Sequence, residues 1–232
     1  MKNKIGASIS TCFGTMLVTR VCFASLTVCF GQPDQSKPTE PDFKTIQAKA
    51  TKGDAAAQQA LGTCYAYGKG AAKNAVEAAK WYRKAAELGN ADAQYSLGWC
   101  YQNGEGVEAG NVDAVKWYRK AAEQGHILAQ YSLGWCCQNG AGTDKSLVEA
   151  AKWYRKAAEQ GHADAQYGLA LYYSQGMAKN RVEAYKWAVL AAEQGYQDAR
   201  KLRDDVERQM KPEQIAEVRK LADAIKSGQL SP

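Results

Sequence analysis

The sequence predicts an all-α protein, a right-handed α-solenoid of stacked antiparallel helix pairs. The octapeptide KWYRKAAE occurs three times, with a degenerate fourth copy, at intervals of 36, 36 and 34 residues. AQYSLGWC and its variants recur between these copies, and in both segments the apolar residues follow helical spacing. A period of this length is typical of solenoids, whose units bury their apolar faces only by stacking on one another. The four copies begin at Lys80, Lys116, Lys152 and Lys186.

The first 31 residues have the order of a secretory signal peptide. Lys2 and Lys4 precede a weakly apolar stretch, Arg20, and an apolar run over 21–30. Residues 32–42 are polar and rich in proline, which predicts a flexible linker. We therefore expect an exported protein, periplasmic or secreted, with an envelope association possible. The alternatives are a retained anchor, although neither half of the leader reaches the ~18 to 20 apolar residues of a membrane span, and a cytoplasmic chain.

The net charge of +6 gives little support to a nucleic-acid partner. Three of the basic residues lie in the leader, which has no acidic residue, so the rest of the chain carries only +3. In the repeats, basic residues alternate with glutamates at spacings of three and four, as in solvated helix pairs. We expect no nucleic-acid binding.

The repeats divide the chain into a series of helical units. We expect a capping helix over 43–52, four two-helix units within 53–194, and closing helices in 195–232, the last beginning near Pro212. Asn90 is a predicted N-cap, and the Asn74-x-x-Glu77 pattern and its copies predict capping boxes at the second helices. Glycine recurs in mid-helix at 62, 98 and 134, which predicts a close helix crossing there. The predicted units are 53–88, 89–124, 125–160 and 161–194.

The pattern A-x-A-Q-Y-x-L-G-x-x-Y-x-x-G-x-G-V, followed by A-x-x-W-Y-x-x-A-A-E-Q-G, resembles the Sel-one-like repeat, a relative of the tetratricopeptide repeat. Residues 91–107 and 114–125 match it nearly throughout. The resemblance implies an adaptor or scaffold that binds a protein or peptide partner. A cysteine-rich subset of the family joins the two helices of each unit by a disulfide. This chain departs from that subset, because no second helix carries a cysteine.

We predict no catalytic residue, metal site or cofactor. His126 and Cys136 lie ten residues apart, about 15 Å along a helix, which is too far for a nucleophile and its base. We interpret His126 and His162 as helix-start residues. Some relatives are linked to peptidoglycan chemistry, so the alternative function is an envelope protein with peptidoglycan-related binding or β-lactamase-like hydrolase activity. The serine-x-x-lysine motif of those enzymes is absent.

The outer face of the first helix in each unit is the predicted protein-binding surface. These positions are not needed for packing within a unit, and they carry aromatic and amide side chains suited to an extended peptide or a partner's helix. The alternative is that the aromatic residues pack between adjacent units. The predicted contact residues are Asp92, Tyr95, Trp99, Gln102, Asn103, Tyr131, Trp135, Gln138, Asn139 and Tyr167.

Overall fold

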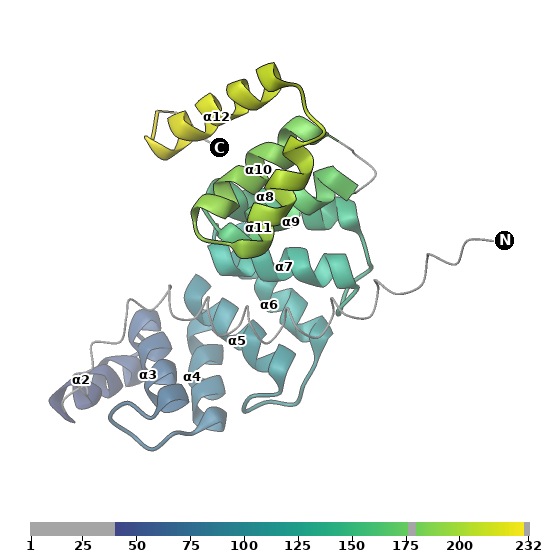
Figure 1. The fold of residues 1–232 in the computed structure, drawn as a ribbon. Coiled ribbons are helices and arrows are strands. Elements are labelled where there is room, and N and C mark those ends of the chain that lie inside the picture. Colours follow the sequence, from purple (N-terminus) through teal and green to yellow (C-terminus); the bar gives the residue numbers. More distant parts are fainter. Residues whose placement is uncertain (1–39, 176–179, 230–232) are drawn as a thin grey trace.

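Eleven α-helices, stacked in chain order, make up the part of the protein that this computed structural model describes, residues 40–175 and 180–229 (Figure 1). The chain is therefore an all-α repeat solenoid. The predicted signal peptide lies outside the described residues. None of the described helices is both long and apolar enough to cross a membrane. The helices are α2 (Glu40–Thr51), α3 (Ala55–Tyr67), α4 (Ala75–Glu87), α5 (Ala91–Asn103), α6 (Asn111–Glu123), α7 (Ile127–Asn139), α8 (Leu147–Glu159), α9 (Ala163–Gln175), α10 (Arg181–Glu193), α11 (Gln197–Glu207) and α12 (Pro212–Lys226).

Four helix pairs form the units: α3 with α4, α5 with α6, α7 with α8, and α9 with α10. Each second helix contacts the first helix of its own unit and the first helix of the next unit. The leading helix, α2, packs on α3. It begins at Glu40, inside the segment predicted as a linker, and Pro41 stands in its first turn, where the missing N–H of proline leaves no bond unmade. Alanines dominate the buried positions, so the helices approach closely along the whole stack.

The predicted mid-helix glycines are explained by tyrosine rings. A β-carbon at Gly98 would lie 2.7 Å from the ring of Tyr118, on the second helix of the same unit, and 3.2 Å from a backbone oxygen of that helix. Gly62 and Gly134 stand in the same relation to Tyr82 and Tyr154. The close approach is therefore mainly between a ring and a backbone. In the fourth unit, Ala170 takes the glycine position and Ala188 the tyrosine position, and both are buried.

Helix starts follow the predicted caps, with one correction. The Asn74 and Ser146 side chains accept hydrogen bonds from the backbone N–H of Glu77 and Glu149, at 3.1 and 3.2 Å. In a capping box the glutamate side chain would also accept the backbone N–H of the cap residue. Here the two glutamates instead form ion pairs with Lys80 and Lys152, three residues later. The N–H of each cap residue is not free for that bond, because it donates to a backbone carbonyl of the preceding helix, Asn74 to Tyr65 at 2.8 Å and Ser146 to Cys137 at 2.7 Å.

A glutamine in each first helix links neighbouring units. The Gln94 side chain donates to the carbonyl of Ala86 in the unit before, at 3.1 Å, and accepts a bond from Gln124, the C-cap of its own second helix, at 2.7 Å. The same two bonds recur in the third and fourth units. We call this series the glutamine ladder. Its members are Gln94, Gln130 and Gln166 with Gln124, Gln160 and Gln194.

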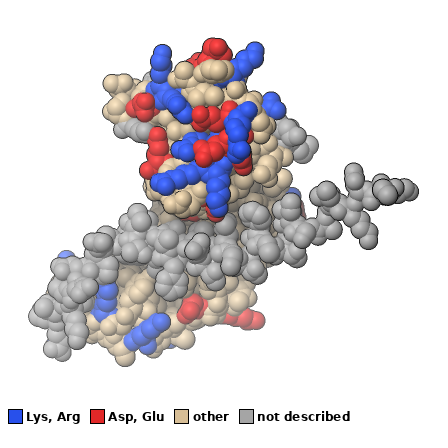
Figure 2. All heavy atoms as spheres, in the orientation of Figure 1, with Lys and Arg blue, Asp and Glu red and all other residues tan. Residues whose placement is uncertain are grey.

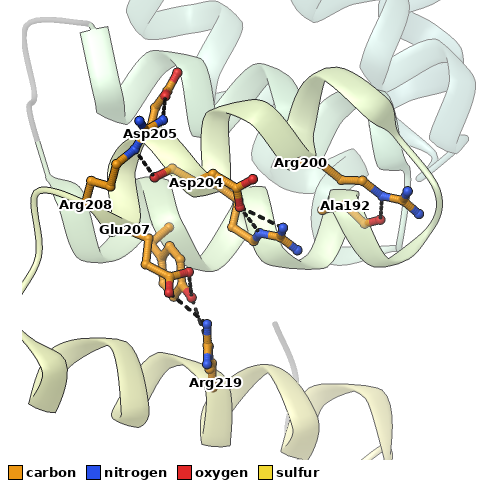
Figure 3. A network of polar contacts seen from close by, with 9 residues as sticks. Ala192, Arg200, Asp204, Asp205, Glu207, Arg208 and Arg219 are labelled. Atoms are coloured by element: carbon orange, nitrogen blue, oxygen red, sulfur yellow. Dashed lines mark hydrogen bonds and ion pairs between the residues drawn. The ribbon is translucent and has the colours of Figure 1, made fainter.

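The C-terminal helices close the stack in two different ways. The first, α11, continues the repeat: Ala199 is buried, and Arg200 donates to the carbonyl of Ala192, as the ladder glutamines do eight residues from their acceptors. The second, α12, turns back and contacts α10 (Figure 1). Arg219 of α12 donates to Glu207 of α11 at 2.9 Å (Figure 3) and to the Tyr185 hydroxyl at 3.1 Å. The helix α12 begins at Pro212, where we expected the last helix to begin.

Candidate protein-binding surface

The predicted tyrosines lie in the junctions between units, as the packing alternative anticipated. The Tyr95 ring stacks on His126 of the next unit, with 4.8 Å between centroids, and Tyr131 stacks on His162 at 4.7 Å. Tyr167 meets Tyr196 at 4.9 Å. Only 6% of Tyr131 is exposed. These rings therefore join successive units. Tyr131 contributes little surface to a partner, whereas Tyr95 and Tyr167 are partly exposed.

The two predicted tryptophans are partly exposed and belong to different core clusters. Trp99 packs against the cluster between the first and second units, and Trp135 against the large cluster that extends to the C-terminal helices. The indole Nε1 of Trp99 is buried and has no hydrogen-bond partner among the described residues. Both rings combine a packing role with an exposed edge, so the structure supports both interpretations of these residues.

The predicted amides divide into two kinds. Gln102 and Gln138 accept short bonds, both 2.6 Å, from the hydroxyls of Tyr118 and Tyr154. They fix the rings that cover the mid-helix glycines. Asn103 and Asn139 are exposed and donate to the backbone carbonyls of Trp99 and Trp135, both at 2.9 Å. The asparagines thus lie at the surface at the C-terminal ends of α5 and α7, the first helices of the second and third units.

The predicted acidic residue, Asp92, is 70% exposed and faces the neighbouring unit. Its Oδ1 lies 3.3 Å from the His126 Nε2. Both histidines start helices, as predicted: the His126 Nδ1 accepts from the backbone N–H of Ala129 at 3.1 Å, and His162 does the same with Ala165 at 3.3 Å. A ring nitrogen that accepts a backbone bond is not available as a catalytic base.

The charges of the solenoid are distributed unequally between its two sets of helices. The four first helices, α3, α5, α7 and α9, contain no lysine or arginine and only two acids, Asp92 and Asp164. The second helices carry the basic triplets, and in the first three units a lysine ammonium covers the tryptophan of the same helix, 4.1 to 4.3 Å from its centroid. At the C-terminal end of the molecule, charges of both signs intermingle (Figure 2).

The predicted absence of a metal site and the cysteines can be compared with the described residues. They contain no cluster of three or more histidine, cysteine, aspartate or glutamate side chains that could hold a metal ion. The described cysteines, Cys64, Cys100, Cys136 and Cys137, are buried thiols that form no disulfide. Burial raises the pKa of Cys100 and of Cys136 to about 12. Both therefore stay protonated and unreactive near neutral pH.

The residues that join the repeats to one another were not predicted from the sequence. The signal for the glutamine ladder was the recurrence of Gln94, Gln130 and Gln166 after an alanine. Their partners lie 28 or 30 residues away in the sequence. A second missed contact joins Arg83 to the Tyr101 hydroxyl at 2.6 Å, with the guanidinium over the ring. The repeated spacing of eighteen residues, seen again between Arg155 and Tyr173, was the available signal.

Comparisons with known proteins agree with this architecture. No curated protein matches the chain. Among solved structures, the chain is similar to a Sel1 repeat protein from Oxalobacter formigenes, with 40% identity and a TM-score of 0.69 over 73% of this chain and 70% of that one. It is also similar to a protective antigen of uropathogenic Escherichia coli strains that displays an SLR fold, with 29% identity and a TM-score of 0.53 over 80% of this chain and 48% of that one.

The profile of the Sel1 repeat matches four consecutive segments, residues 55–90, 91–126, 127–162 and 163–196. These begin two residues after each unit boundary that we predicted. Sel1 repeat proteins are generally scaffolds that bind protein partners, and the peptidoglycan-directed alternative gains no support from the comparisons. With four matched repeats covering more than half of its length, the chain belongs to the Sel1 repeat family.

Proposed function

We propose that this protein is a non-catalytic adaptor that binds an extended segment of a partner protein along the concave side of the solenoid, formed by its first helices. The observation that carries the proposal is the absence of lysine and arginine from α3, α5, α7 and α9, against the basic triplets on the second helices. A face with few charges loses little solvation energy when a partner covers it. Trp99 and Trp135 add apolar area, and Asn103 and Asn139 add hydrogen-bonding groups.

The repeat spacing favours a particular partner conformation. Successive first helices meet where Tyr95 of α5 stacks on His126 at the start of α7, so we take their spacing as about one helix-packing distance, 8–10 Å. A polyproline II segment has three residues per turn and rises about 3.1 Å per residue, so side chains three residues apart recur about every 9 Å on one face. We therefore propose that Trp99 and Trp135 receive apolar side chains spaced three residues apart, while the exposed asparagines bind the peptide backbone.

The test is affinity capture from native envelope extract with residues 32–232 as bait, followed by binding measurements with the captured partner. Aromatic anchors are often worth about 2 kcal/mol or more, roughly a thirtyfold loss of affinity for each one removed. We expect the double variant Trp99→Ala with Trp135→Ala to lose capture. Trp117→Ala is the matched control, because Trp117 is similarly half-buried but lies on a second helix. It should bind as the wild type does.

A second pair of substitutions separates binding from folding. Trp99 and Trp135 also pack in the core, so their removal lowers stability as well. Asn103→Lys with Asn139→Lys adds two charges at exposed positions and leaves the packed rings in place. Each variant is checked by circular dichroism and thermal melting on the sample used for binding. If the folded lysine variant binds the partner as tightly as the wild type, the first-helix surface is not the binding site.

We also propose that the chain is exported. The support is the order of basic, apolar and small residues in 1–31, followed by the polar segment 32–42. The mature protein should begin at Gln32, or at Ser25 if cleavage follows Ala24. Intact-mass measurement of the protein from a fractionated native host tests this, and an uncleaved chain in the cytoplasmic fraction would contradict it.

A further inference from the structure

The first helices of successive units are capped by different residues. Asp54 caps α3 and Asn90 caps α5, each through a side-chain oxygen that accepts the backbone N–H three residues on. The third and fourth units use His126 and His162 for the same bond. At two consecutive junctions between units, the N-cap of the following first helix is therefore an imidazole. At the preceding junction the same position is an amide, that of Asn90.

The histidine caps exist only while the imidazole is neutral. Each Nδ1 accepts a backbone N–H, at 3.1 Å in His126 and 3.3 Å in His162, so each proton sits on Nε2. Imidazolium carries a proton on both nitrogens and has no acceptor. Protonation therefore removes the cap, and it also places a positive charge at a helix N-terminus, where the helix dipole disfavours it. The amide of Asn90 does not titrate in this way.

The surroundings of the first ring, His126, come mainly from the preceding unit. On α5, Tyr95 stacks on the ring, and the Asp92 carboxylate lies 3.3 Å from Nε2. Tyr118 of α6 contacts Tyr95 in a tilted arrangement, with 5.7 Å between ring centroids. Burial lowers the pKa of His126, and Asp92 opposes part of that shift.

The second ring, His162, lacks the cross-junction carboxylate, because Leu128 stands at the position of Asp92. Tyr131 of α7 stacks on it, and Tyr154 of α8 contacts Tyr131 in a tilted arrangement. On its own helix, Asp164 lies 3.9 Å from Nδ1 and also hydrogen bonds to Tyr196. Burial lowers the pKa of His162, with Asp164 again opposing.

We propose that the junctions at His126 and His162 are acid-sensitive joints, which loosen as the caps protonate while the Asn90 junction holds. The folded pKa lies below the ordinary value of about 6.5 for both rings. The contribution of each neutral cap is therefore complete above pH 6.5 and is lost as the pH falls towards and through the folded pKa. Over that range, opening of each joint can rise up to about tenfold per pH unit.

Hydrogen exchange on the full chain between pH 5 and 7.5 tests the proposal. After correction for the intrinsic pH dependence of exchange, we expect peptides covering 127–131 and 163–167 to lose protection as the pH falls. The equivalent peptide over 91–95 serves as the internal reference and should keep its protection. Equal loss at all three helix starts would overturn the proposal.

The matched variants are His126→Asn and His162→Asn, which install the residue that the chain itself uses at Asn90. Each should abolish the pH dependence at its own joint and leave the other joint unchanged. The same acid-induced loss in the variants would show that the imidazoles are not responsible. If a variant proves poorly folded at pH 7.5, the comparison of the three helix starts within the wild type still decides. The outcome does not depend on whether a partner binds.

Discussion

One position breaks the glutamine ladder, and restoring it should stabilise the protein. Gln58 of α3 donates to the Ala50 carbonyl at 3.2 Å, as the other ladder glutamines do to theirs. Its Oε1, however, is buried without a partner among the described residues. The C-cap that would bind it, thirty residues on, is Leu88, whereas the next two units have Gln124 and Gln160. We therefore predict that Leu88→Gln completes the ladder.

The geometry of the site suits the substitution. Leu88 is 59% exposed, so little apolar contact is lost with it. Its backbone angles, φ −80° and ψ 2°, are close to those of Gln124, φ −82° and ψ 1°, which reaches its glutamine at 2.7 Å. A net hydrogen bond is worth about 0.5–1.5 kcal/mol, and the acceptor here is already buried and unsatisfied. We expect about 1 kcal/mol of added stability, or a rise in Tm of about 2–4 °C.

Denaturant unfolding and thermal melting of matched variants provide the assay. Leu88→Ala is the control, because it removes the leucine without supplying an amide, and it should not stabilise the protein. Gln124→Leu is the converse: it leaves the Oε1 of Gln94 buried without its donor and should cost about 1–3 kcal/mol. If Leu88→Gln is no more stable than Leu88→Ala, or if Gln124→Leu is neutral, the ladder does not stabilise the stack.

Three further predictions concern packing. Gly98→Ala should destabilise the protein by about 1–3 kcal/mol, because its β-carbon would lie 2.7 Å from the Tyr118 ring. Adding Tyr118→Ala should cost less than the two single changes together, which a double-mutant cycle of unfolding free energies measures. Deleting residues 212–232 should lower the Tm and cause aggregation, visible by light scattering, and Val189→Arg with Leu190→Lys should restore solubility. The four buried thiols of residues 32–232, silent in the native state at pH 8, should give about four equivalents with a thiol reagent when that mature protein is denatured without reductant; a result near zero would show disulfides.

The repeat period determined most of what could be predicted about the fold. Helical spacing and the period together gave the helix pairs, the histidine helix starts and the Asn90 cap, because these depend on residues close in sequence. The capping boxes were predicted wrongly in one respect, since the N–H groups of Asn74 and Ser146 donate to carbonyls of the preceding helices and the glutamates pair with lysines instead. A local motif states which bonds are possible. It does not decide which of two nearby partners a carboxylate takes.

The candidate surface was harder to predict, because one helix face serves two neighbours. A first helix lies between the second helix of its own unit and that of the unit before, so its outward residues also meet the following junction. Tyr95 and Tyr131 were placed on the binding surface because nothing within their own unit required them. Their partners, His126 and His162, belong to the next unit. Contacts between units join residues about thirty positions apart, which helical periodicity within one unit does not reveal.

The end of the solenoid shows that comparing units with one another recovers such contacts. At the positions held by Arg155 and Lys156 in the third unit, the fourth unit has Val189 and Leu190. A charged pair at a solvated helix face becomes apolar only if something covers that face. The covering element is α12, whose Val218 belongs to the same core cluster as these two residues. The pattern of the last helix alone predicted only that it closes the stack, as a lid. Matching the apolar pair on α10 with the apolar face of α12 also predicts where the lid docks. In the other units the same positions are charged and face solvent, so an apolar pair in one copy of the repeat indicates that this copy is covered there.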